Sequence, residues 1–169
     1  MLLFDIRTAA SKAVPVDGTL ERDDAVWIDG DTRPAESVHV TGRLSPAGQG
    51  TLYFSGQLTG EATAECRRCL ADARVPVTDD VHLVFAEAGT EGADDPDVYP
   101  LDAQSGSLDL RPAVREQWLL AAPAYALCRE DCKGLCSTCG ADLNAGPCSC
   151  QKAPDPRWAA LSKLTTDRS

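Results

Sequence analysis

The sequence has no long apolar run at its start or elsewhere. Asp5 and Arg7 interrupt the first residues, which leaves no apolar stretch of the ~7 to 15 residues typical of a signal peptide. No later stretch approaches the roughly 20 apolar residues of a membrane helix. We therefore expect a cytoplasmic protein without a membrane partner, in a compartment where thiols stay reduced.

Histidine, aromatic residues and basic residues are also scarce. The two histidines, His39 and His82, lie in no H-E-x-x-H motif, and the chain has no glycine-rich phosphate loop and no nucleophile elbow. We therefore expect no enzymatic activity and no small-molecule substrate. Acidic residues outnumber basic ones by 26 to 16, and the net charge of -10 favours a basic protein partner over nonspecific binding to phosphates.

Apolar and polar residues alternate from residue 38 to residue 85, as they do in antiparallel strands with one buried face. Turn residues at 45–50 separate the first two runs, and the Cys66–Cys69 segment forms a later turn. Two more short runs follow past Pro76. The pattern predicts a meander of four to six strands or an open barrel, with these inward residues: Val38, Val40, Leu44, Leu52, Phe54, Leu58, Val75, Val77, Val81, Leu83 and Phe85.

A loop and two helices are expected around this sheet. Residues 86–106 are rich in Gly, Asp and Glu, which predicts a solvated acidic loop. Asp109 is expected to cap a helix that covers one face of the sheet, buries Trp118 and ends at Pro123. Asp155 before Pro156 predicts a short terminal helix. The expected fold class is α+β, with a β-rich domain over residues 1–127 and a cysteine-rich zinc module over 128–169 packed on it.

The sequence contains eight cysteines, and six of them lie within residues 128–150. A C-x2-C turn presents two thiolates to a tetrahedral metal such as zinc. The most economical division joins the pair Cys66 and Cys69 with Cys128 and Cys132, and leaves a self-contained second set. We therefore expect two structural Zn²⁺ sites, one from Cys66, Cys69, Cys128 and Cys132 and one from Cys136, Cys139, Cys148 and Cys150.

Three other uses of these cysteines fit the sequence less well than structural zinc. Disulfides fit poorly with a chain that shows no export signal. A thioredoxin-like redox pair at Cys66 and Cys69 would need a helix N-terminus, whereas this pair lies between strand patterns. A catalytic zinc would need an open coordination position and normally His or Glu ligands. Arg67, Arg68 and Lys133, beside the cysteines, are candidate contacts for RNA or a partner.

Four ordered motifs carry a resemblance to a known family. They are the segments at 64–70, 106–110, 132–144 and 155–158, which read AECRRCL, GSLDL, CKGLCSTCGADLN and DPRW. Over nearly its whole length the chain resembles the YceD family of large ribosomal RNA subunit accumulation proteins.

The resemblance implies a non-enzymatic role in bacterial large-subunit assembly, with a genomic link to a small basic ribosomal protein. Some members of the family lack the distal cysteines, which implies that the cluster from Cys136 to Cys150 is an accessory stabiliser. The expected partner is a ribosomal protein or assembly factor bound through acidic surface. Direct recognition of ribosomal RNA by the zinc-bound end is the alternative.

Overall fold

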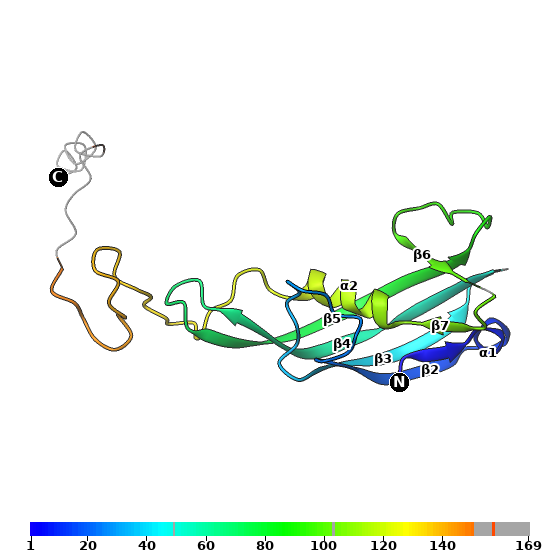
Figure 1. Cartoon of the computed structure of the whole chain (residues 1–169), viewed down its shortest axis with the longest axis horizontal. Coiled ribbons are helices and arrows are strands. Elements are labelled where there is room, and N and C mark those ends of the chain that lie inside the picture. Colours follow the sequence, from blue (N-terminus) through cyan, green and yellow to red (C-terminus); the bar gives the residue numbers. More distant parts are fainter. Residues whose placement is uncertain (49, 103, 151–156, 158–169) are drawn as a thin grey trace, which may run out of the picture.

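An open five-stranded sheet dominates the computed structural model, which describes residues 1–48, 50–102, 104–150 and 157. Its strands, in spatial order, are β2 (Val14–Glu21), β3 (Ser37–Pro46), β4 (Thr51–Glu65), β5 (Asp72–Glu87) and β6 (Val98–Leu101). Strands β2 to β5 are antiparallel neighbours, and β6 lies parallel to β5. The mainly β architecture is confirmed, but residues 38–85 form three strands where four to six are expected, and the first strand of the meander, β2, lies before the predicted region (Figure 1).

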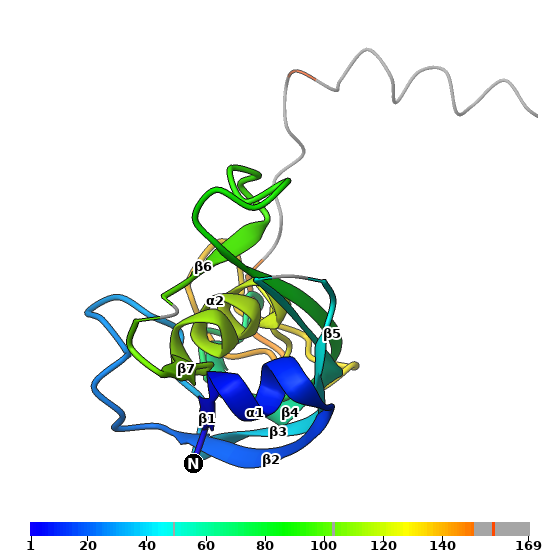
Figure 2. The same ribbon diagram turned by 90° about the vertical axis from the view of Figure 1, so that its right-hand side faces the viewer.

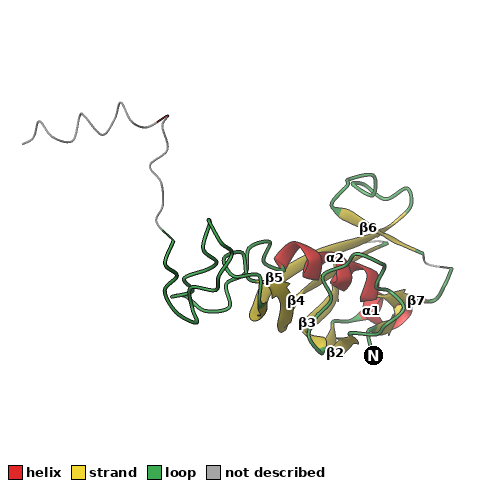
Figure 3. Cartoon of the chain, turned by 60° about the vertical axis from the view of Figure 1, so that its left-hand side comes forward, coloured by secondary structure: helices red, strands yellow, loops and turns green. Residues whose placement is uncertain are grey.

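Both helices lie on one face of this sheet (Figures 2 and 3). They are α1 (Ile6–Ser11) and α2 (Arg111–Ala121), and a small antiparallel pair of β1 (Leu3–Asp5) and β7 (Ser107–Asp109) lies beside them. The predicted helix containing Trp118 is thus confirmed. The sequence predicts one covering helix, whereas the structure has two. Six residues are too few for a helical repeat to be recognised in α1.

The core lies between the helices and the inner face of the sheet. Val38, Val40 and Leu44 of β3 are fully buried, while their neighbours on the strand face solvent. Trp118 of α2 is also fully buried, and its ring lies over Gly60, where a Cβ would come within 3.0 Å of the indole. The indole Nε1 donates a 2.8 Å hydrogen bond to the Thr32 carbonyl, which confirms Trp118 as a core residue.

Strands β4 and β5 form a long hairpin whose far end carries the first cysteine pair (Figure 1). Its register runs without interruption from Thr51 opposite Ala86 to Glu65 opposite Asp72. The expectation of two short runs past Pro76 is therefore wrong, because β5 is one strand of 16 residues. Among the described residues, β6 pairs only with residues 84–87 of β5, so β5 is an edge strand at Pro76. The missing N–H of Pro76 therefore costs no hydrogen bond between strands.

Two boundaries differ from those predicted. The acidic stretch 86–106 contains the end of β5 and all of β6, whose Leu101 is buried, so the loop prediction fails at residues 86–87 and 98–101. A four-residue run that includes a proline gives little strand signal. Helix α2 begins one residue later than expected, with Leu110 at its N-cap. The Asp109 carboxylate still accepts hydrogen bonds from the Arg111 amide and guanidinium.

The predicted terminal helix, with Trp158, Leu161 and Leu164, lies outside the described residues. Within the described part of the chain, neither helix has the length and apolar character needed to cross a membrane. The division into residues 1–127 and 128–169 stays a prediction.

Candidate metal centre

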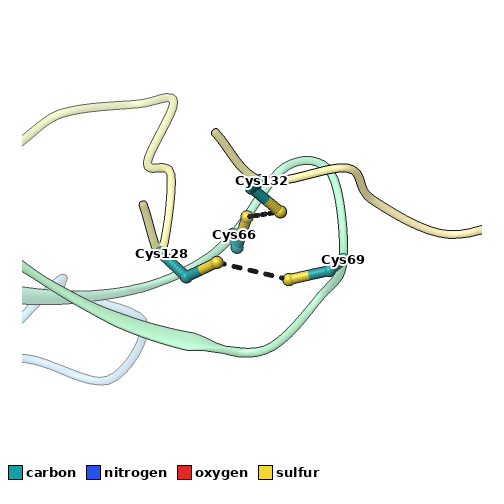
Figure 4. Close-up of side chains that lie close together, drawn as sticks. All are labelled: Cys66, Cys69, Cys128 and Cys132. Carbon is teal, nitrogen blue, oxygen red and sulfur yellow. Dashed lines mark hydrogen bonds between the residues drawn. The ribbon is translucent and has the colours of Figure 1, made fainter. Parts of the chain in front are cut away.

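The first cysteine cluster joins the tip of the β4–β5 hairpin to the segment that follows α2. Cys66 and Cys69 come from the tip, and Cys128 and Cys132 from the later segment (Figure 4). The Sγ atoms of Cys66 and Cys132 are 3.8 Å apart, and those of Cys69 and Cys128 are 3.6 Å apart. In a tetrahedron with metal–sulfur bonds of about 2.3 Å, neighbouring sulfurs lie about 3.8 Å apart. All four cysteines are free thiols, and these two distances match such a tetrahedron, with all four sulfurs within 4.8 Å of one another.

Backbone hydrogen bonds shape the turn that presents the first pair. The Cys66 amide donates to the Ala71 carbonyl at 2.8 Å, and the Leu70 amide donates to the Cys66 carbonyl at 2.8 Å. This closure places Leu70 in the left-handed region, with φ of 60°. The Arg67 amide donates to the Ala126 carbonyl at 3.0 Å, which fixes the second segment beside the turn.

The second cluster repeats this local frame. The Cys136 amide donates to the Ala141 carbonyl at 2.8 Å, and the Gly140 amide donates to the Cys136 carbonyl at 2.9 Å. Gly140 has φ of 73° and occupies the position that Leu70 holds in the first turn. The Sγ atoms of Cys136, Cys139, Cys148 and Cys150 lie within 4.8 Å of one another. The sulfurs thus fall into the two groups of four that their spacing favours, each close enough to hold a metal ion.

The two clusters share an electrostatic arrangement as well. A hydrogen bond from the Cys128 amide lowers the pKa of Cys66 to about 6, and this effect is larger than the opposing effect of burial. In the second cluster, hydrogen bonds from the Cys139 and Thr138 amides lower the pKa of Cys136 to about 6. The hydrogen bond with Cys69 raises the pKa of Cys128 to about 12. Each cluster therefore has one thiol poised to ionise, and a cation that replaces the remaining protons would be bound by four thiolates.

Burial differs between the ligands of the first cluster. Cys66 and Cys132 are 0% and 2% exposed, whereas Cys128 is open to solvent. No histidine or carboxylate belongs to either four-cysteine group in the described part of the chain. A site of four sulfurs is coordinatively complete, which suits a structural ion better than a catalytic one.

The three cationic residues predicted as contacts lie around the first cluster in different roles. The Arg68 guanidinium donates to the carbonyls of Cys132 at 2.8 Å and Glu130 at 3.3 Å, so it ties the two cysteine segments together. The Arg67 guanidinium lies 5.8 Å from the centroid of the exposed Tyr125 ring. Lys133 is exposed, and its amide donates to the Asn144 side chain. Their contact with RNA or a partner stays a prediction.

Asn144 is a site residue that the spacing of the cysteines does not indicate. Its Nδ2 lies 3.6 Å from Cys132 Sγ, in hydrogen-bonding contact with a sulfur of the first cluster, although Asn144 itself lies between cysteines of the second. Groups that hydrogen-bond the ligands of a metal orient them and tune their affinity. Asn144 closes the motif at residues 132–144, and it is the single asparagine of the sequence.

Fold and site together define a β-rich protein with two four-cysteine centres, one of which clamps its longest hairpin to the segment after α2. The sequence profile of the large ribosomal RNA subunit accumulation proteins, YceD, matches residues 54–165. The chain belongs to the YceD family, which confirms the resemblance.

Known relatives span bacteria and a plant chloroplast protein. The chain is 30% identical over 125 residues to the uncharacterized protein Rv2926c of Mycobacterium tuberculosis, covering 72% of this chain and 59% of that protein. It is 27% identical over 164 residues to the uncharacterized protein YlbN of Bacillus subtilis, covering 96% and 94%. The large ribosomal RNA subunit accumulation protein YCED homolog 1, chloroplastic, of Zea mays is 34% identical over 70 residues, covering 41% and 24%.

The chain thus spans about three fifths of the length of the mycobacterial relatives. No solved structure matches it.

Proposed function

We propose that the protein is a zinc-stabilised, non-enzymatic factor that supports accumulation of large-subunit ribosomal RNA. Membership of the YceD family supports the RNA-related role. The observation that carries the zinc assignment is the pair of four-cysteine clusters, in each of which all four sulfurs lie within 4.8 Å of one another. Zinc prefers such thiolate sets, and a closed set leaves no position for a reacting water. The proposed compartment is the bacterial cytoplasm, where thiols remain available to a metal.

In this proposal the first zinc holds the hairpin tip against the Cys128 segment. The segments that it joins are about 60 residues apart in sequence. A metal that closes so long a loop stabilises the folded arrangement much as a cross-link does. The zinc ions therefore supply shape, and recognition of the partner falls to the protein surface.

The proposed partner is a basic ribosomal protein or assembly factor, bound through the loop between β5 and β6. This loop projects from the sheet (Figure 2) and exposes four carboxylates in a chain of net charge -10. They are Glu91, Asp94, Asp95 and Asp97. Such a concentration of one sign attracts an oppositely charged partner and speeds its association.

Replacement of the chromosomal gene tests both parts of this proposal. In cells that lack the protein we expect a lower ratio of large-subunit to small-subunit ribosomal RNA. The wild-type gene should restore the ratio, and a variant with Glu91→Gln, Asp94→Asn, Asp95→Asn and Asp97→Asn should not. A second variant with Asp23→Asn, Asp29→Asn, Glu36→Gln and Asp72→Asn makes the same change in net charge at other exposed sites and should restore it. An unchanged ratio in the deletion strain would refute the role itself.

A pull-down with the tagged full chain at moderate salt identifies the kind of contact. We expect a basic ribosomal protein or assembly factor to be retained after RNase treatment and to be lost with the loop variant. Retention that RNase abolishes would instead favour RNA as the bound species. Salt should weaken the contact, because exposed charges are screened.

One observation favours direct RNA binding as a second candidate. Arg67 and Tyr125 place a cation and an exposed aromatic ring together at the hairpin tip, a combination on which nucleic-acid bases stack. Arg67→Ala with Lys133→Ala tests this without removing the structural hydrogen bonds of Arg68. Binding of a ribosomal RNA fragment at physiological salt that this double variant abolishes would favour RNA over a protein partner.

A further inference from the structure

The side chain of Asn144 connects the two cysteine clusters. Its Oδ1 accepts hydrogen bonds from the Lys133 amide at 2.8 Å and the Arg129 guanidinium at 2.8 Å. Its Nδ2 donates toward Cys132 Sγ at 3.6 Å. Arg129 and Lys133 are the sequence neighbours of Cys128 and Cys132, so one amide group holds the ligand segment of the first site by three contacts.

The orientation of this amide is fixed by its surroundings. Nδ2 also donates to Asp142 Oδ1 at 2.7 Å, and the Asn144 amide donates to the same oxygen at 2.9 Å. Turning the amide over would place Nδ2 against two donors and Oδ1 against a carboxylate. Oδ1 therefore faces the Lys133 amide, and Nδ2 faces the sulfur.

Asn144 lies in the loop that the second cluster closes. Cys139 and Cys148 flank this loop, and their sulfurs lie within 4.8 Å of each other. The Leu143 amide donates to the Gly134 carbonyl at 2.9 Å, and Leu135 forms a bridge with Asp142. A metal in the second cluster would clamp both ends of the loop and hold Asn144 in place.

The chain between the clusters is fixed from the other side by the first turn. The Leu135 amide donates to the Arg68 carbonyl at 2.9 Å. Gly134 has φ of 75°, and a Cβ there would lie 2.7 Å from the Arg68 carbonyl oxygen. The connection between Cys132 and Cys136 is thus short and held in place, which keeps the loop that carries Asn144 beside the first site.

We infer that the two metal sites bind as a coupled pair, with Asn144 as the positioning residue through which the second site raises the affinity of the first. The inference rests on the proposed zinc binding and adds regulation of that site. Hydrogen bonds to a thiolate stabilise its charge, and removing such a partner costs about 10- to 100-fold in metal affinity. Coupling of this kind is reciprocal, so the first ion also strengthens binding of the second.

A cycle of full-length variants measures the coupling. Cys139→Ser with Cys148→Ser leaves only the first site, and Cys69→Ser with Cys128→Ser leaves only the second. The reduced, metal-free proteins are titrated with Co²⁺ in the presence of a competing chelator, and the sulfur-to-cobalt absorption reports occupancy. The coupling factor is the overall binding constant of the unmodified chain divided by the product of the two single-site constants.

We expect a coupling factor of about 10 to 100 in the unmodified chain. Asn144→Ala should reduce it to near one, and Asn144→Asp should do the same, because a carboxylate oxygen cannot donate to Cys132 Sγ. Ala145→Ser, an exposed neighbour in the same loop, serves as the control and should keep the full coupling factor.

Two results would overturn the inference while leaving zinc binding intact. One is a coupling factor of one in the unmodified chain, and the other is a factor that Asn144→Ala leaves unchanged. Failure of the unmodified chain to bind metal would instead refute the proposed zinc sites. The two failures are therefore distinguishable in one set of titrations.

Discussion

At the scale of single residues, the Asp31–Arg115 pair joins the β2–β3 connection to α2. Arg115 Nε and Nη2 each donate a 2.7 Å hydrogen bond to the carboxylate, whose side chain is 6% exposed. These hydrogen bonds lower the pKa of Asp31, against the effect of burial. The pair stabilises the ionised form of Asp31, so its contribution to folding depends on pH.

Arg115→Met should destabilise the protein at pH 7, because it leaves a nearly buried carboxylate without its partner. A lowered pKa in the folded state means that the pair contributes fully above the ordinary aspartate value of about 3.9 and is lost as pH falls through the folded value. The difference in unfolding free energy between variant and wild type should therefore shrink below that pH. Urea unfolding at stepped pH measures it, with exposed Arg43→Met as the control. A gap that widens toward acid would contradict the assignment.

Residue patterns in the sequence predict some site residues and miss others for a physical reason. The cysteines are predictable because C-x2-C spacing is local and thiolate chemistry is specific. Arg68 and Asn144 are not, because their function depends on which carbonyl or sulfur the folded chain brings within 2.8 to 3.6 Å. Hydrogen bonds between segments distant in sequence leave no mark on spacing.

At the scale of elements, α2 is fixed to the sheet by one large side chain. Trp118 fills the space above Gly60 and hydrogen-bonds the Thr32 carbonyl. Trp118→Ala should cost about 3 to 5 kcal/mol of unfolding free energy, because it opens a cavity and removes a buried donor. Leu120→Ala, on the same helix but 74% exposed, should change stability by less than about 0.5 kcal/mol. Equal effects of both substitutions in denaturant unfolding would show that α2 is not docked through Trp118.

Element prediction from the sequence follows the strength of the local repeat. The strands β3, β4 and β5 are long and alternate cleanly, so their inward faces are predictable. Strands β1, β6 and β7 have three or four residues each, too few for a period of two to stand out. Their positions are determined by contacts with partners elsewhere in the chain, such as Leu3 opposite Asp109.

At the scale of the whole molecule, the sheet core and the metal centres are separate sources of stability. The main buried apolar cluster includes Val40, Phe54 and Trp118 but none of the cysteines. Removing zinc from the reduced protein with a chelator should therefore preserve the strand signal in circular dichroism. Hydrogen exchange should accelerate by about a hundredfold or more at Cys66, Leu70, Cys136 and Gly140, whose amides depend on the metal-bound turns. Added zinc should restore protection, and global unfolding on chelation would contradict the separation.

At saturating zinc, substitution of one cysteine in each cluster should have different local effects for the two centres. Cys66→Ser should release the hairpin tip from the Cys128 segment, because the substitution removes a fully buried ligand at the point where the two meet. Cys139→Ser should act chiefly on residues 136–150, since that ligand is exposed and its cluster is local in sequence. Limited proteolysis and metal content should then show one zinc lost from each variant, with new cleavage near residues 66–71 only for Cys66→Ser. Loss of both ions and the same cleavage pattern from either substitution would mean that the eight sulfurs form a single unit.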